Sequence, residues 1–245
     1  MVEFAALITA LAALIGAILW PSLILIFLIM YRRPIRAAFD QLPTMIHRAE
    51  KAKVGMFEFE LRAQAEAAPA IADREQGRVS AEQITSAAKL EVFSQEVSFD
   101  YIRAHLERLA KEYDTLRAAM PAGTERTRAM NKIMAQMRVL GPSLSLLVND
   151  LKSSGSAGER LAALAIMQMD TRKADLSWIA DRFPKEAPFV FYQAALLLQT
   201  LAQARPEIQE AVQGVARSAL KTLRSFPGTP DTNTIKVLEA VVKIH

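Results

Sequence analysis

The sequence predicts a mainly α-helical protein with one N-terminal transmembrane helix and a cytoplasmic helical domain. Three observations lead to this fold class. Phe4–Met30 contains no charged side chain, a basic stretch follows it at once, and the remainder repeats apolar residues at helical spacing. We divide the chain into an anchor (1–33), a juxtamembrane and linker segment (34–79), a long-helix bundle (80–152) and a region of shorter helices (153–245).

The apolar run is long enough to cross a bilayer, because a spanning helix needs about 20 apolar residues. A cleaved signal peptide is the alternative, but it would begin with positive charges and have a shorter apolar core. Here Glu3 is the only charge before the run. Lys and Arg that follow a span stay on the cytoplasmic side. We therefore expect an uncleaved anchor with the N-terminus outside and the domain in the cytoplasm.

The predicted span is asymmetric. Its first half is rich in small residues, which either permit close helix contacts in lipid or reflect the high alanine content of the chain. Trp20-Pro21 predicts a bend, because proline leaves a backbone carbonyl without its helical hydrogen bond. The residues assigned to the span are Phe4, Ala6, Ala13, Gly16, Trp20, Pro21 and Met30.

The positive charge is concentrated beside the span. Residues 31–55 hold six Lys or Arg side chains against two acidic ones, which equals the net charge of +4 of the whole chain. Arg32, Arg33 and Arg36 either contact anionic headgroups or serve only as a topology signal. The remainder carries mixed charge, so we expect no nucleic-acid partner.

Residues 56–61 alternate between apolar and acidic side chains. Phe57, Phe59 and Leu61 then share one face, which favours a short β-strand or hairpin near 50–61. The alternative is a chance alternation inside a helix. A lone strand needs a partner from the same chain or from a second copy.

Ser80 and Gln83 form a capping-box pattern that opens a helical segment to about Ala119. This segment carries a heptad stripe, which either packs within the domain or mediates self-association. The residues that we assign as candidate oligomer contacts are Phe57, Phe59, Leu61, Ile102, Leu106, Leu109 and Tyr113.

Further helices are expected after residue 123. The expected ranges are 124–140, a helix begun by Gly141-Pro142, 159–169, 174–183, 188–204, 206–225 and 231–244. Paired short helices of this kind suggest a HEAT-like α-solenoid. The Gly- and Ser-rich stretch at 152–158 is interpreted as a hinge, with an anion site as the alternative.

No catalytic motif is present. His47, His105 and His245 have no metal-ligand spacing, and the absence of cysteine removes disulfides, thiolate nucleophiles and Cys-based metal sites. We therefore expect no enzyme activity, no cofactor and no metal, and no small-molecule substrate is evident.

Three motifs resemble those of an uncharacterised bacterial family of HEAT-like helical modules. The resemblance covers about residues 100–200. The motifs are Tyr113-Asp114-x-Leu116-Arg117-x-x-Met120-Pro121-x-Gly123-x-x-Arg126-Thr127-x-x-Met130, Gly158-Glu159-Arg160-Leu161-Ala162-Ala163-Leu164-Ala165 and Pro188-Phe189-Val190-x-Tyr192-x-Ala194-Ala195. The family often has histidine where Gln193 stands. The resemblance implies a helical module joined to a membrane span or signalling domain, some members belonging to bacterial signalling or antiviral defence systems.

Two classes of function follow for a protein of the bacterial inner membrane. In the first, the helical domain is a protein–protein interaction module or scaffold that recruits a partner to the bilayer. In the second, the chain oligomerises, gathers several spans and permeabilises the bilayer.

Overall fold

The computed structural model describes most of the chain beyond residue 53 and single positions before it. The described residues are 20, 21, 23, 25, 27, 29–32, 54–68, 78–94, 98–227 and 231–244. The chain forms two compact units, Met1–Ala52 and Lys53–His245.

The first unit contains the predicted span. Its described residues are helical apart from a turn at Tyr31, whose N–H donates to the carbonyl of Phe27 at 2.9 Å. Within the described positions, no helix has the length and apolar character needed to cross a membrane. Several assigned residues lie outside the described positions, so the span and its bend stay predictions. These residues are Phe4, Ala6, Ala13, Gly16, Arg33 and Arg36.

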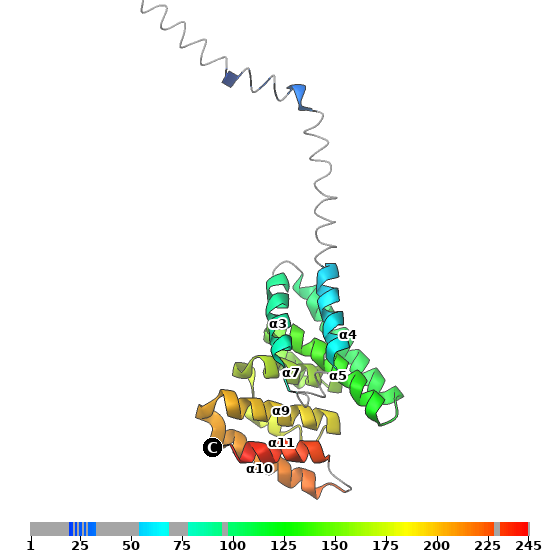
Figure 1. The fold of residues 1–245 in the computed structure, drawn as a ribbon, viewed down its shortest axis with the longest axis vertical. Coiled ribbons are helices and arrows are strands. Elements are labelled where there is room, and N and C mark those ends of the chain that lie inside the picture. The colour runs from blue at the N-terminus through cyan, green and yellow to red at the C-terminus, as the bar shows by residue number, and fades with distance from the viewer. Residues whose placement is uncertain are drawn as a thin grey trace, which may run out of the picture. The chain divides into compact units, whose positions relative to one another are not determined.

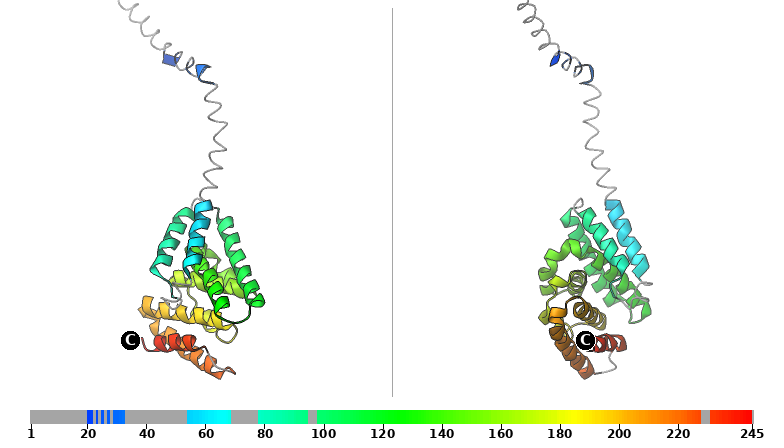
Figure 2. Two further views of the ribbon diagram at one scale, coloured as in Figure 1. Left: turned by 45° about the vertical axis from the view of Figure 1, so that its right-hand side comes forward. Right: turned by 60° about the vertical axis from the view of Figure 1, so that its left-hand side comes forward.

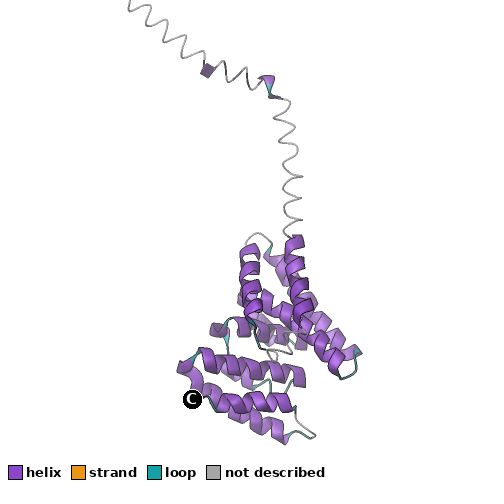
Figure 3. Cartoon of the chain, viewed as in Figure 1, coloured by secondary structure: helices purple, strands orange, loops and turns teal. Residues whose placement is uncertain are grey.

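The described part of the second unit consists of helices joined by loops, with no strand (Figure 3), which confirms the mainly α prediction. Its helices are a helix over 54–68, α3 (Ala81–Ser94), α4 (Phe99–Ala119), α5 (Thr124–Leu140), α6 (Val148–Ser153), α7 (Ala157–Met169), α8 (Leu176–Ala180), α9 (Pro188–Ala204), α10 (Gln209–Ser225) and α11 (Thr232–Val242). Short 3₁₀ helices are η1 (Pro142–Leu147), η2 (Thr171–Lys173) and η3 (Pro206–Ile208).

Local sequence signals explain where these helices begin. Ser80 and Gln83 form the expected reciprocal capping box, with distances of 3.2 and 3.3 Å. The Ser156 hydroxyl accepts the N–H of Glu159 at the start of α7. Proline occupies the first turn of α9, where its missing N–H costs no hydrogen bond.

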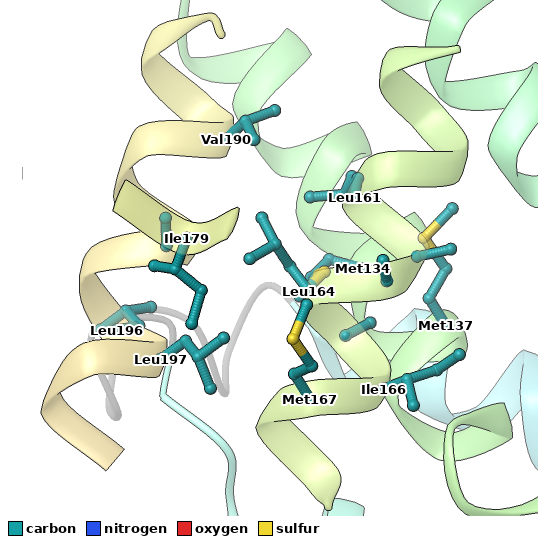
Figure 4. Packing of buried hydrophobic residues seen from close by; sticks show 14 of the residues in the cluster. Met134, Met137, Leu161, Leu164, Ile166, Met167, Ile179, Val190, Leu196 and Leu197 are labelled. Atoms are coloured by element: carbon teal, nitrogen blue, oxygen red, sulfur yellow. The ribbon is translucent and has the colours of Figure 1, made fainter. Parts of the chain in front are cut away.

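The centre of the domain is α7, because its residues from Leu161 to Gln168 are all buried. A helix that is apolar on all sides must be covered on all sides. In Figure 4, Leu164 lies between Met134 of α5 and Leu197 of α9. Helices α9, α10 and α11 pack on one another beyond it, as Figures 1 and 2 show. The arrangement of these helices as HEAT-like repeats remains a proposal.

The expected strand near 50–61 is wrong, because residues 54–68 form a helix. The buried residues are Phe57, Leu61, Gln64 and Ala68, which follow helical rather than alternate spacing. Phe59 is 71% exposed and lies on the opposite side from them. The linker expected over 62–79 is therefore helical as far as Ala68.

The segment expected from Ser80 to Ala119 is divided into α3 and α4. Helix α3 packs on α5 and η1, whereas α4 packs mainly on α5 and α7. Ser98, just before α4, has an extended ψ of 134°. The heptad pattern within α4 is thus interpreted correctly as helical, but it does not extend back through α3.

Candidate functional site

A cavity of about 720 Å³ opens between α4, α5, α9 and α11. Its size lies within the range of about 300–1,000 Å³ that small-molecule sites occupy. Its walls combine cations, aromatic rings and amides. The lining residues are Arg78, Tyr113, Arg117, Arg126, Thr127, Met130, Asn131, Ala187, Pro188, Phe189, Tyr192, Gln199, Asp231, Asn233, Lys236, Val237 and Ala240.

The cavity is strongly positive. Four cationic side chains, of Arg78, Arg117, Arg126 and Lys236, face one carboxylate, that of Asp231, so the formal balance is 4 − 1 = +3. In the described part of the chain, no carboxylate lies within ion-pair distance of Arg117 or Lys236. Uncompensated cations in a recess attract anions.

The one carboxylate of the cavity has a structural task. Asp231 caps α11 by accepting the N–H of Thr234 at 3.0 Å, the hydroxyl of Thr234 at 2.5 Å and the N–H of Asn233 at 3.4 Å. Carboxylates at this position stabilise the helix start. Asp231 therefore fixes the first turn of α11, and Lys236 lies on the second turn.

Two buried polar atoms in the cavity wall have no hydrogen-bond partner. They are the hydroxyl of Tyr113 and Oε1 of Gln199, whose residues are 0% and 5% exposed. Leaving a buried polar group unpaired costs about 1–3 kcal/mol. The presence of an unpaired buried polar group calls for an explanation, and a ligand that forms a hydrogen bond with the group is one explanation.

Burial raises the pKa of the Tyr113 hydroxyl, while the nearby Arg117 guanidinium opposes that rise. The Tyr113 phenol is therefore a neutral donor at physiological pH. Its ring lies 6.0 Å from that of Phe189, which joins α4 to the start of α9 at the cavity. Arg126 is held by a 3.0 Å hydrogen bond to the Met120 carbonyl. Much of the cavity wall is thus positioned before any ligand arrives.

Next to the cavity lies a buried arginine, Arg138 of α5. It donates to Gln168 of α7 at 2.7 Å, to Gln193 of α9 at 2.9 Å, and to the backbone carbonyl of Arg78 at 3.3 Å. Gln168 in turn donates to the Gln193 carbonyl at 2.9 Å. Burial lowers the pKa of Arg138 to about 10, which still leaves it charged near neutral pH. This network joins three helices and the segment that carries Arg78.

The 152–158 stretch does not hold an external anion, because a carboxylate of the protein occupies its helix terminus. Asp114 of α4 accepts the Ser156 hydroxyl at 2.6 Å and the Gly158 N–H at 2.9 Å. An acidic group at a helix N-terminus is stabilised by the helix dipole. The contact fastens α7 to α4 at this end.

A buried ion cluster supports the same region. Glu186 accepts hydrogen bonds from Arg160 and from Arg182, the latter at 3.1 Å. Arg182 also lies over the Trp178 ring, 4.7 Å from its centroid. Paired in this way, the Glu186 carboxylate is tolerated although its side chain is only 3% exposed.

The residues assigned as oligomer contacts are mostly internal. Phe57 and Leu61, and the four stripe residues of α4, are buried in the domain core. The α4 stripe therefore packs within the chain, which is one of the two alternatives left open by the sequence. Phe59 is the member of this group that stays exposed. The four stripe residues are Ile102, Leu106, Leu109 and Tyr113.

His105 is a packing residue, whereas His47 and His245 lie outside the described residues. The His105 ring meets the ring of Phe57 edge-on, 6.0 Å between centroids, and its Nδ1 pairs with Arg108. No group of three metal-ligating side chains occurs in the described part of the chain.

The burial of His105 predicts a pH-dependent stability. Burial first, and then the Arg108 charge, lower its pKa to about 4, whereas Glu58 opposes the shift. The folded pKa lies below the unfolded value of about 6.5. Its contribution is therefore complete above pH 6.5 and is lost as the pH falls towards 4. We expect denaturant unfolding of His105→Gln to show a smaller loss of stability than wild type between pH 6.5 and 4. If the free energy of unfolding of the variant and of wild type fell equally with pH over this range, the prediction would be wrong.

Sequence reasoning did not predict the cavity, although two of the quoted motifs line it. The first motif supplies Tyr113, Arg117 and Arg126, and the third supplies Pro188, Phe189 and Tyr192. The Lys and Arg side chains of α5, Arg126 among them, are the sequence signal that could have indicated it. Comparison of the chain with protein-family models, curated proteins and solved structures finds no match.

Proposed function

We propose that this chain is a single-pass inner-membrane protein whose cytoplasmic helical domain is an interaction module that binds an anionic partner. The observation that carries the binding role is the cavity: no carboxylate of the described residues pairs with its Arg117 or Lys236, and its walls hold two buried polar atoms without a hydrogen bond of normal geometry. The membrane role rests on the uncharged run Phe4–Met30 and the basic residues after it. Binding in the cavity would hold the partner at the bilayer.

Catalysis is less well supported than binding. Among the described residues that line the cavity there is no histidine, serine or cysteine, and the carboxylate among them, that of Asp231, caps a helix. A general base and a nucleophile in mutual contact would be needed for acyl or phosphoryl transfer. The cavity residues instead offer charge and hydrogen bonds, which are the means of recognition.

The proposal is tested with the full chain in neutral detergent, using pyrophosphate and a fluorescent hexaglutamate peptide as anionic probes. We expect at least one of them to bind saturably, and Arg117→Gln with Lys236→Gln to weaken that binding at least tenfold. Arg217→Gln with Lys221→Gln removes the same charge from exposed positions of α10 outside the cavity and should have little effect. Failure of both probes would refute the binding role.

The membrane role is tested separately by fractionation. The full chain should remain in the membrane pellet after alkaline carbonate extraction, and a chain without residues 1–33 should not. The oligomeric-effector alternative is not carried further as a second proposal, because the strand assigned to it is a helix and most of its contact residues are buried. A large oligomer on sizing in detergent would revive it.

A further inference from the structure

We propose that the anionic partner of the cavity is a small phosphorylated molecule with a flat, hydrogen-bonding part. This inference rests on the proposed function, since it names the partner of the same cavity. Three features of the wall carry it: the number of cations, the depth of the two unpaired polar atoms, and the aromatic rings between them.

The cavity has more positive charges than its single described carboxylate can neutralise. The formal excess of three positive charges matches a ligand with two or more negative charges. A phosphate monoester carries about −1.5 to −2 near neutral pH and offers three acceptor oxygens. The guanidinium of Arg117 or Arg126 can meet two of those oxygens at once, and this geometry favours phosphate. Lys236 adds a point charge from α11.

The unpaired polar atoms require a ligand that reaches into the wall. The Tyr113 hydroxyl can donate, and the Gln199 side-chain oxygen can accept, so the ligand needs an acceptor and a donor. Both residues are at least nine-tenths buried. Neither atom is open to the cavity in the ligand-free protein, so a ligand pairs with them only if neighbouring side chains shift as it enters.

The aromatic rings favour a flat group. Phe189 and Tyr192 supply two partly exposed rings at the cavity, and Asn131 and Asn233 lie among its polar walls. Planar heterocycles stack on such rings and present donors and acceptors at their edges. The cavity volume of about 720 Å³ accommodates a molecule of mononucleotide size.

The test measures binding of ADP and pyrophosphate to the full chain in neutral detergent by isothermal titration calorimetry, without magnesium. We expect saturable binding, tighter for ADP than for pyrophosphate because the base contacts the rings. Arg117→Gln with Lys236→Gln should weaken it at least tenfold, and Arg217→Gln with Lys221→Gln less than twofold.

Tyr113→Phe is the sharper variant. The Tyr113 hydroxyl makes no hydrogen bond of normal geometry in the ligand-free protein, although it interacts with the Arg117 side chain, so its removal should change the thermal midpoint little. ADP binding should nevertheless weaken about fivefold. A variant that lost stability but kept its affinity would overturn the role of this hydroxyl as a ligand contact.

The remaining outcomes separate this inference from the proposed function. If hexaglutamate binds through Arg117 and Lys236 while ADP and pyrophosphate do not bind at millimolar concentration, the inference is overturned and the proposed function stands. If none of the three probes binds, both are overturned. ADP binding that is equal in the cavity variant and the α10 control also overturns the inference, because the ligand would then bind elsewhere.

Discussion

Replacing Gly158 with alanine is expected to lower the free energy of unfolding by about 3 kcal/mol, the upper end of the usual cost of overpacking. A Cβ atom at this position would lie 2.0 Å from the carbonyl oxygen of Ala110 and 2.6 Å from its carbonyl carbon. These are backbone atoms inside α4, so they cannot rotate away as a side chain would. The two helices must separate, and α7 is the helix on which the core is assembled.

Urea unfolding of the full-length protein in neutral detergent, followed by circular dichroism, measures this loss. Gly214→Ala is the matched control, because Gly214 lies inside α10 and a Cβ there meets nothing within 4 Å. Alanine is favoured over glycine in a helix by about 1 kcal/mol, so the control should become more stable. A gain in stability for Gly158→Ala as well as for Gly214→Ala would show that α4 and α7 are not in such close contact.

Replacing Arg138 with leucine is expected to cost about 2–4 kcal/mol, because neutral buried acceptors lose their donor. The substitution leaves the side-chain oxygen of Gln168 without its donor, and leaves that of Gln193 only the 3.3 Å hydrogen bond from the Gln168 amide. Each buried acceptor left in this state costs about 1–3 kcal/mol. Leucine also has fewer heavy atoms than arginine, so a cavity would form where α5, α7 and α9 meet.

The same unfolding measurement applies, with Arg128→Leu as the control. Arg128 belongs to α5 as well, but its side chain is exposed, and we expect a change within about 0.5 kcal/mol there. Arg138→Lys should be intermediate, because a lysine amine keeps the charge but cannot reproduce the fork of the guanidinium. If Arg138→Leu proved as stable as wild type, the network would not be what holds these helices together.

The helices of the domain were largely predictable, because the signals that begin and end them are local. The capping box at Ser80 and Gln83, the proline at 188 and the Asp231 cap each act within one turn. The separation of α4 from α3 at the extended residue Ser98 was missed because no proline or glycine marks it. It follows from the different packing partners of α3 and α4.

The error at residues 54–61 has a physical origin. Six residues in which acidic and apolar side chains alternate fit the period of a strand. They fit equally well a short stretch of helix in which one aromatic side chain is exposed. The longer set of Phe57, Leu61, Gln64 and Ala68 distinguishes the two, but it includes a glutamine. Gln64 is buried because it donates to the hydroxyl of Ser86 on α3 at 2.7 Å. That partner is visible only in the folded chain.

The sequence by itself determined the helical class of this protein, most of its helix boundaries, and the contrast between an uncharged N-terminal run and the basic residues beside it. Only the tertiary structure decided the site. The cavity brings together Arg78, Arg117, Phe189 and Lys236 from four separate segments, and its two unpaired atoms become buried only when α4 and α9 meet. The signals that begin and end helices act over a few residues. Whether a charged side chain has a counter-ion, and whether a hydrogen-bonding group has a partner, depends on how the helices pack. These properties cannot be predicted from the order of the residues along the chain.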